Sequence, residues 1–502
     1  MDKLLQIQNN EKINRADIPH LPFETFRQQL LECAATGGKV VQFFAYEDEG
    51  VSKLLAVMRT DKLYVGGCDA PDSFASLTAE SEIFHMFERE IGEQYGLKAE
   101  GHPWLKMVRY HSNYNGKKDV FDNNYSQDIP GNYPYFSVEG ETVHEVAVGP
   151  VHAGIIEPGH FRFQCCGERV FHLEIQLGYQ HRGVEKLLQS VPLKRMAIIA
   201  ETIAGDTTIG HGLCQAQALE ALAGLEVDKG AKTVRTIALE LERIANHIGD
   251  LGALSLDVAF NPPSAYFGRI RGEYLNPTQI LGGNRFGRGL VRAGGVTHVM
   301  GDEQKKLLRD KLAELTPEVE HVNELIFSAP SVTGRFDNTG KVSKENAEKI
   351  GLVGYAGRAS GLSYDARVSF PTECYAELPA NSNSKTDGDV HSRGMVRREE
   401  IMHSTSLINT LLDKMEEAKS YTPQELLQLA PHSFVVSINE GWRGEVSHCI
   451  LTDAKGEILR YKVKDPSFHN WMGLALSLRD EGISDFPLCN KSFNLSYCGF
   501  DL

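Results

Sequence analysis

Two β-prone runs near the start of the chain predict a hairpin. They cover Lys39–Glu47 and Lys53–Thr60, and the polar segment DEGVS between them favours a turn. Helical spacing of aromatic and aliphatic residues predicts a helix over Ser76–Tyr95. We therefore expect residues 1–122 to form a small α/β-sandwich-like domain.

Residues 123–142 are predicted to be a linker. They overlap the stretch FDNNYSQDIPGNYPYF, which is rich in Asn, Pro, Gly and Tyr, and such residues interrupt regular structure. The remainder, residues 143–502, is predicted to form a second, larger domain.

This second domain is expected to be mainly helical. Apolar residues step by four and three along Thr233–Leu254, and a similar pattern covers Asp302–Phe327 and Met395–Lys419. Near the C-terminus, Glu445–Thr452 and Ile458–Val463 flank the turn sequence DAKG and predict a peripheral β-hairpin. The expected fold class is therefore α+β.

Composition narrows the functional classes. The net charge of −15 argues against non-specific binding to nucleic acid or anionic lipid, so no nucleic-acid partner is expected. No apolar run approaches the roughly 18 to 20 residues that span a bilayer, and the N-terminal sequence lacks the apolar stretch of a signal peptide. If the protein works at a membrane, another subunit must hold it there.

Nine cysteines are scattered along the chain without a single C-x-x-C pair. This argues against a zinc ribbon, a thioredoxin-like redox motif or an iron–sulfur cluster held by this chain alone. Scattered and odd in number, the cysteines fit a reduced intracellular protein better than a disulfide framework.

Common nucleotide and hydrolase motifs are missing. The sequence contains no Walker A motif, no H-E-x-x-H and no G-x-S-x-G. The glycine-rich stretch Gly282–Gly289 resembles a phosphate cradle, but it lacks flanking strand and helix patterns, which favours a structured loop.

Longer segments carry a resemblance to a known family. They read GPVHAGIIEPGHFRF from Gly149, GYQHRGVEKLL from Gly178, ELERIANHIGD from Glu240 and ISDFPLCNKSFNLSYCGFDL from Ile483. In this order they resemble the large subunit of energy-converting nickel–iron hydrogenases of the formate hydrogenlyase and hydrogenase-4 type, and the related quinone-site, D-type subunit of respiratory complex I. Residues 76–110 resemble the C-type complex I polypeptide that is fused to the large subunit in such proteins.

The resemblance breaks down at the metal site. In these hydrogenases two C-x-x-C pairs hold nickel, because soft thiolates suit the metal. Here the matching positions are Ala204, Thr207, Ser496 and Gly499. We therefore expect neither nickel binding nor hydrogen activation, and no cofactor held by this chain itself.

Two kinds of site could replace the lost metal centre. His211 and three cysteines, Cys214, Cys489 and Cys498, offer a zinc-like ligand set, although buried cysteines are commonly core residues. In complex I the cavity binds quinone instead. Here Ile156 or Glu157 stands at the quinone-binding histidine and Gly205 at the tyrosine, while Tyr497 could supply a hydroxyl group.

Four polar residues are the candidate proton-transfer and pocket residues. The resemblance places Glu157 at the proton-transferring glutamate of hydrogenases and Arg443 at the arginine above the metal. Asp206 and His211 lie at the emptied early motif, where they could exchange protons. The structural alternatives are a loop carboxylate for Glu157 and an ordinary core histidine for His211.

A second set is implied to face the iron–sulfur partner: His181, Arg182, Glu185 and Lys186. Without the resemblance this segment reads as an exposed, charged helix start. Arg393, in DVHSRGMVRR, is either part of a buried charge network or of a solvated basic face.

The resemblance implies a peripheral redox subunit on the cytoplasmic face of a membrane-bound, ion-translocating complex. It would pass electrons from a partner's iron–sulfur cluster to a quinone-like or other small acceptor. The implied partners are a small iron–sulfur protein related to the B-type polypeptide of complex I, a ferredoxin-like iron–sulfur protein and antiporter-like membrane proteins. The alternative is a non-catalytic coupling scaffold in the same complex.

Overall fold

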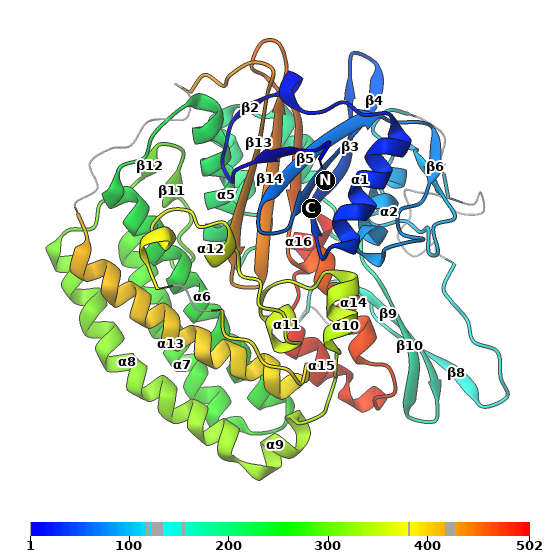
Figure 1. Cartoon of the computed structure of the whole chain (residues 1–502). Coiled ribbons are helices and arrows are strands. Elements are labelled where there is room, and N and C mark those ends of the chain that lie inside the picture. Colours follow the sequence, from blue (N-terminus) through cyan, green and yellow to red (C-terminus); the bar gives the residue numbers. More distant parts are fainter. Residues whose placement is uncertain (1, 117–119, 122–133, 153–155, 380–381, 417–426) are drawn as a thin grey trace.

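The computed structural model describes residues 2–116, 120–121, 134–152, 156–379, 382–416 and 427–502. Its fold is α+β, with a sheet-rich N-terminal part, a helical part and a sheet buried between them (Figure 1). Most of the predicted linker lies outside the described residues, so the predicted domain boundaries stay predictions. Within the described part of the chain, no helix is long and apolar enough to cross a membrane.

The N-terminal part contains a four-stranded antiparallel sheet in the order β1-β5-β4-β3. Its strands are β1 (Leu5–Ile7), β3 (Lys39–Asp48), β4 (Val51–Arg59) and β5 (Leu63–Asp69). A separate parallel pair joins β6 (Ser73–Ala75) to β7 (Lys98–Glu100), and the helices are α1 (Phe23–Ala35) and α2 (His85–Tyr95). The predicted β3–β4 hairpin is confirmed.

The helix predicted over Ser76–Tyr95 is shorter than the pattern indicated. A 3-10 turn begins at Glu82 and the α-helix α2 only at His85. The cause is the buried Glu88 carboxylate, which accepts hydrogen bonds from the Ser76 hydroxyl (2.6 Å) and the Leu77 backbone N–H (2.7 Å). These bonds hold the preceding segment in a turn at residues 77–80 instead of a helix, because a buried carboxylate requires donors.

The helical part begins after a three-stranded antiparallel sheet that the sequence did not predict. Its strands are β8 (Val143–Val148), β9 (His160–Cys166) and β10 (Arg169–Gln176). The following elements are α3 (Val184–Ser190), α4 (Leu193–Ala200), α5 (Thr208–Ala223), α6 (Lys229–Asp257), α7 (Asn261–Gly282), β11 (Val291–Arg292), β12 (Gly295–Val296), α8 (Asp302–Ser328), α9 (Pro330–Phe336), α10 (Lys344–Ile350), α11 (Gly354–Ala359), α12 (Ala366–Ser369) and α13 (Val390–Lys414).

The three long predicted helices are present as α6, α8 and α13. Helix α6 extends the predicted span to Lys229, where Asp228 caps it by accepting a hydrogen bond from the Ala231 backbone N–H. Helix α13 begins earlier than predicted because Asp389 caps it in the same way. Residues 417–419 of that prediction lie outside the described residues.

The C-terminal elements include a sheet that contradicts the expectation of peripheral hairpins. Strands β13 (Ser433–Gly441), β14 (Gly444–Thr452) and β15 (Ile458–Lys464) follow one another, and β2 (Ile13–Asn14) pairs with β13. The predicted hairpin is therefore present as β14 and β15, but β13 and β14 are buried along their whole length. Figure 1 shows them between the N-terminal strands and the helices.

The two faces of this sheet explain its burial. Phe434, Val436 and Ile438 of β13 pack with residues of β3 to β5, while Val435 and Ile450 on the other face pack in a cluster with residues of α3 to α5. Alternate side chains of a strand point to opposite faces, so a sheet covered on both faces buries both sets of side chains, including polar ones such as Ser437 and Glu440.

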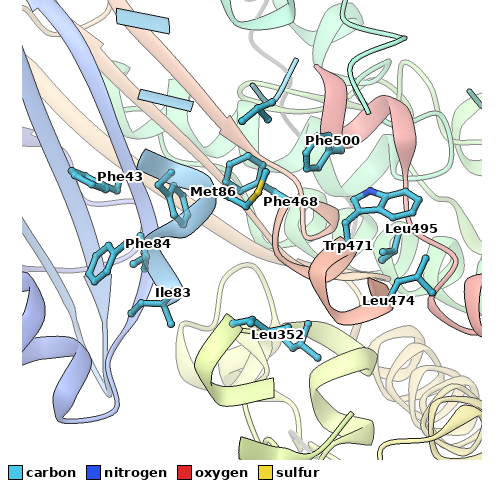
Figure 2. Close-up of a cluster of buried hydrophobic side chains, with 14 of the residues drawn as sticks. Phe43, Ile83, Phe84, Met86, Leu352, Phe468, Trp471, Leu474, Leu495 and Phe500 are labelled. Carbon is cyan, nitrogen blue, oxygen red and sulfur yellow. The ribbon is translucent and has the colours of Figure 1, made fainter. Parts of the chain in front are cut away.

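One apolar cluster joins the N-terminal part to the last helices, α14 (Ser467–Ser477), α15 (Phe486–Phe493) and α16 (Tyr497–Asp501). Figure 2 shows Phe43 and Phe84 at one end of it and Trp471, Leu474 and Leu495 at the other. The N-terminal part is thus packed into the core that surrounds the C-terminus.

Replacing Leu474 by Ala is expected to lower the free energy of unfolding by about 2–5 kcal/mol, because the residue is fully buried and its truncation leaves a cavity. Guanidinium denaturation followed by tryptophan fluorescence measures the change. The matched control is Leu256→Ala, which removes a side chain that is 57% exposed and should change stability by less than about 0.5 kcal/mol. Equal losses in both variants would contradict this packing.

Candidate functional site

The two segments that correspond to the lost metal motifs meet in the structure. Arg182 joins them, because its guanidinium donates to the carbonyl oxygen of Ile203 (2.9 Å) and to that of Cys498 (3.3 Å). The first segment precedes α5 and contains Ala204 and Thr207, which are both buried. The second begins α16, where the Ser496 hydroxyl caps the helix by accepting a hydrogen bond from the Gly499 N–H.

Arg443 and Asp206 form one ion pair at this junction. The guanidinium donates to both carboxylate oxygens of Asp206, at 2.6 and 2.7 Å, and also to the Asn494 carbonyl (2.6 Å). It stacks on the Trp442 ring, 3.9 Å from the ring centroid, while the indole N–H donates to the Asp206 carbonyl. The charge of Arg443 is therefore already balanced by Asp206, which bidentate geometry favours.

His211 pairs with a different carboxylate from the one expected. Its Nε2 lies 3.0 Å from Asp465 Oδ2, and its Nδ1 lies 3.1 Å from Nε2 of His448, whose Nδ1 contacts the Tyr461 hydroxyl at 2.8 Å. The predicted proton exchange between Asp206 and His211 is thus replaced by a buried chain of four hydrogen-bonded side chains that begins at Asp465.

The charge state of this chain follows from its surroundings. Burial alone would raise the pKa of Asp465, but the hydrogen bond from His211 and the charges of His211 and Arg443 outweigh it and hold that pKa below its usual range. Burial, with His211 adding to it, lowers the pKa of His448 well below its usual value. Asp465 is therefore an anion and His448 a neutral imidazole.

The residues present do not fit a nickel ion. None of the four family positions carries a thiolate, and Asp465 fills the space beside one of them. A Cβ atom added at Gly499 would lie 2.8 Å from Asp465 Oδ2 and 2.8 Å from the Ser496 hydroxyl oxygen. A cysteine at that position would therefore clash, and the oxygen that occupies the space is a hard ligand rather than a soft one.

The alternative zinc-like ligand set is not brought together. The Cys214 thiol contacts Asn439 and the Val446 carbonyl, and burial raises its pKa to about 12. Cys489 instead packs beside Gly340, where an added Cβ would lie 2.6 Å from its sulfur. Among the described residues, no group of three or more His, Cys, Asp or Glu side chains could hold a metal ion.

Glu157 lies at the edge of the junction, next to Cys498. The thiol has its pKa raised to about 11, mainly by burial and in addition by the charge of Glu157. The Cys498 sulfur also lies 3.4 Å from the Ser496 hydroxyl oxygen. The site therefore places a half-buried carboxylate against a protonated thiol, a contact that the sequence did not indicate.

An apolar cavity of about 400 Å³ adjoins the junction. Asn494 and Tyr497 line it, so it reaches both the residue that binds Arg443 and the start of α16. The buried Tyr497 hydroxyl makes no hydrogen bond of ordinary geometry within the described part of the chain, and burial raises its pKa to about 12. The other lining side chains include Ile156, Phe161 and Phe486.

The four residues expected at the partner face divide into two groups. Arg182 and Lys186 are exposed, and His181 stacks on His111 with ring centroids 4.7 Å apart. Glu185 points inwards, in contrast to the expectation. Its carboxylate is 2% exposed and lies 2.7 Å from both Arg460 and Lys462 of β15, whose buried charges it balances.

Arg393 is buried, so the solvated alternative is wrong. Its guanidinium donates to the Gly388 and Gly340 carbonyls and to the Ser492 hydroxyl, all neutral acceptors. Burial lowers its pKa to about 10.

Comparisons with known proteins match this picture. Residues 257–437 match the family described as respiratory-chain NADH dehydrogenase, 49 Kd subunit. Hydrogenase-4 component G of Escherichia coli is 26% identical over 92% of this chain and 80% of that protein. Formate hydrogenlyase subunit 5 of Escherichia coli is 28% identical over 82% and 74%. The C/D polypeptide of NADH-quinone oxidoreductase from Phocaeicola vulgatus is 26% identical over 75% and 76%.

Among solved structures, a chain of the membrane-bound sulfane sulfur reductase, an archaeal respiratory membrane complex, shares the fold. The match has a TM-score of 0.67 and 23% identity, and it covers 72% of this chain and 99% of that one. The chain is therefore similar to hydrogenase and NADH-quinone oxidoreductase subunits over most of its length, and the family match covers residues 257–437. Positions 204, 207, 496 and 499, where the resemblance places nickel-ligand cysteines, carry Ala, Thr, Ser and Gly.

Gly499→Ala is expected to lower the free energy of unfolding by about 1–3 kcal/mol, because the new methyl group would overlap the Asp465 carboxylate. Denaturant titration measures the loss. The matched control is Gly268→Ala in α7, where nothing lies within 4 Å of an added Cβ and helix propensity predicts a gain of about 0.5–1 kcal/mol. A gain in both variants would show that Asp465 does not occupy this space.

Proposed function

We propose that the chain is the peripheral large subunit of a membrane-bound, ion-translocating oxidoreductase related to complex I and the energy-converting hydrogenases. It accepts electrons from an iron–sulfur cluster in a partner protein and passes them to a quinone-like or other small acceptor, without hydrogen activation. The family match over residues 257–437 and the names of the relatives support the first part of this proposal. The solved structure that shares the fold belongs to a respiratory membrane complex, which supports it too.

The cavity beside the positions that correspond to the metal site is the main observation in favour of an electron acceptor bound by this chain. Its volume of about 400 Å³ and its lining by Ile156, Phe161 and Phe486 suit an apolar, ring-shaped molecule. The Tyr497 hydroxyl, which lies near Asn490 but makes no hydrogen bond of ordinary geometry among the described residues, is a donor for an acceptor oxygen or sulfur atom. The substrate class is therefore a small, largely apolar electron acceptor.

Reduction of such an acceptor takes up protons as well as electrons. Glu157 and Cys498 are next in sequence to the cavity-lining residues Ile156 and Tyr497. They interact with each other, and Asp206 is paired with Arg443. A half-buried carboxylate next to a thiol can take a proton from solvent and release it inwards. Coupling of this protonation to ion movement would run through the membrane subunits.

The electron donor is proposed to dock at the exposed face that carries His181, Arg182 and Lys186. Arg182 contacts the backbone on both sides of the junction, so a partner bound there would lie next to the site. The proposed partners are a small iron–sulfur protein related to the B-type polypeptide of complex I, a ferredoxin-like iron–sulfur protein and antiporter-like membrane proteins. The complex would hold the chain at the cytoplasmic face of the membrane.

A specific observation favours a second candidate, a coupling scaffold without redox chemistry. The guanidinium above the former metal position is neutralised by Asp206, and Asp465 fills part of the vacated space. Electron-transfer assays on the purified complex with quinones, sulfur compounds and ferredoxin separate the two functions. Filled iron–sulfur clusters without any acceptor activity would favour the scaffold.

Ile156→Trp is expected to raise the KM for the acceptor, because the larger side chain fills the cavity that Ile156 lines. Steady-state acceptor reduction by the purified complex measures it. Val368→Trp, at a position that is 45% exposed on α12, is the matched control and should leave KM unchanged. The same KM for wild type and Ile156→Trp would place the acceptor elsewhere.

Tyr497→Phe is expected to lower kcat/KM about threefold to tenfold, as loss of one hydrogen bond to the acceptor would. The control Tyr266→Phe changes a tyrosine that is 58% exposed.

Replacing both Glu157 by Gln and Arg443 by Leu in one protein is expected to abolish acceptor binding. Wild-type turnover in this double variant would overturn the proposed role of the junction.

A further inference from the structure

Glu242, on α6, contacts the first turn of α5. One carboxylate oxygen accepts a hydrogen bond from the Ile209 N–H at 2.7 Å and the other from the Gly210 N–H at 3.2 Å. Helix α5 has no side-chain cap of its own at Thr207, so the Glu242 carboxyl group takes that place. The residue is 8% exposed.

Among the described residues, no cation forms an ion pair with this carboxyl group. The described part of the chain shows no ion pair to Glu242, and the neighbouring arginines are engaged elsewhere. Arg243 donates to the carbonyls of Glu440 and Gly441 and pairs with Glu240, while Arg443 is bound to Asp206. A buried carboxyl group without a cation favours its neutral, protonated form.

The charged groups that face Glu242 act in opposite directions. Burial, and in addition the negative charge of Asp206, raise its pKa, and the net value is about 8. The two backbone N–H groups and the positive charge of Arg243 lower it. Glu242 therefore changes its protonation state close to neutral pH, whereas the Glu240 carboxyl group, which pairs with Arg243 and Arg367, has its pKa lowered to about 2.

A narrow pocket connects Glu242 to the surface. Its volume of about 20 Å³ is enough for one ordered water. Glu242 and Asn246 line it together with Arg285 and Phe286, which are both exposed, and with Asp206, whose side chain is 35% exposed. The glycine-rich loop Gly282–Gly289, singled out in the sequence, thus forms the mouth of this pocket.

We propose that Glu242 carries protons between solvent at the Arg285–Phe286 mouth and Asp206 at the candidate site, through a water held in the pocket. The neutral carboxyl group releases its proton through the water to the Asp206 carboxylate, which is held by Arg443, and is reprotonated from solvent. No other bond forms or breaks. The use of this proton in acceptor reduction rests on the proposed function, but the exchange itself does not.

This route differs from the one through Glu157. Glu157 contacts Cys498 at the start of α16, whereas Glu242 faces Asp206 in the loop before α5. Two carboxyl groups thus approach the junction from separate segments of the chain. Of the two, Glu242 is the one whose pocket holds both a surface mouth and the Asp206 carboxylate.

Infrared difference spectroscopy of the purified complex at increasing pH tests the proposal directly. The wild type should show a protonated-carboxyl C=O band that disappears with an apparent pKa near 8, and the band should be missing in Glu242→Gln. The amide oxygen of Gln still accepts a backbone hydrogen bond, so the variant is expected to fold. Persistence of the same titrating band in Glu242→Gln would overturn the assignment.

The matched control is Glu88→Gln. Glu88 is also a buried carboxyl group bonded by backbone N–H groups, but it lies in the N-terminal part beside Ser76 and Thr78. This variant should keep both the band that titrates near pH 8 and the acceptor turnover. Loss of that band in Glu88→Gln would show that the band arises from Glu88 rather than from Glu242, and it would overturn the proposal.

Two further measurements separate proton transfer from a purely structural role. Turnover of Glu242→Gln should fall at least about tenfold and lose its alkaline decline near pH 8. Equal loss at every pH would indicate a structural cap and contradict the proposal.

Wild-type stability should fall as pH rises from 4.5 towards 8, because the neutral form is favoured only in the folded state, and Glu242→Gln should lack this decline.

A different result would contradict the proposed function. A complex without any acceptor activity would overturn the acceptor role, while the infrared band and the pH dependence of stability would still decide whether Glu242 exchanges a proton.

Discussion

The turn between β13 and β14 packs so closely on the start of α11 that only glycine fits at the contact. A Cβ atom at Gly354 would lie 1.9 Å from the Arg443 carbonyl oxygen, and Gly444 approaches the same backbone from the other side. Both glycines have positive φ angles, which other residues adopt at a cost. This contact fixes the turn, and through it the position of Arg443. The bidentate pair then fixes Asp206, and Asp206 lies in the loop that begins α5.

Charges inside this core are retained where neighbouring groups balance them. Glu185 neutralises Arg460 and Lys462, Asp206 neutralises Arg443, and Asp465 is held by His211. Burial of an unpaired ion would cost several kcal/mol. The same holds at the positions that correspond to the metal site. Where the resemblance implies thiolates around a cation, this chain has side chains that form ion pairs and hydrogen bonds with one another. Glu242 and Arg393 lack a partner of opposite charge among the described residues: burial favours the neutral form of Glu242, and Arg393 donates to neutral acceptors.

The spacing of apolar residues was sufficient to predict those helices and strands whose structure depends on local sequence. The apolar spacing along α6 and the β-prone runs of β3 and β4 located these elements to within a few residues. It failed where contacts with residues distant in the sequence determine the bounds or the burial of an element. The Glu88 carboxylate shortened a helix, and both faces of β13 and β14 are covered by remote parts of the chain.

The same limit applies to the site. The resemblance located Asp206, His211 and Arg443, but their partners could not be read from the sequence. Asp206 and Arg443 are 237 residues apart, and His211 and Asp465 are 254 apart. Within one motif, Glu240 and Glu242 look equivalent, yet the first is bound by two arginines and the second by none among the described residues. Contacts made by the folded chain, rather than local spacing, separate an inert carboxylate from a titrating one.

The pairing of β2 with β13 has a consequence for assembly. Residues 13 and 14 complete the edge of a sheet whose other strands lie more than four hundred residues further along the chain. If the two parts were separate polypeptides, this edge would be closed by a bimolecular encounter and would depend on the supply of both. On one chain the closing strand is present at a high effective concentration and in equal stoichiometry from the moment of synthesis. Fusion thus protects an exposed sheet edge from pairing with the wrong molecule.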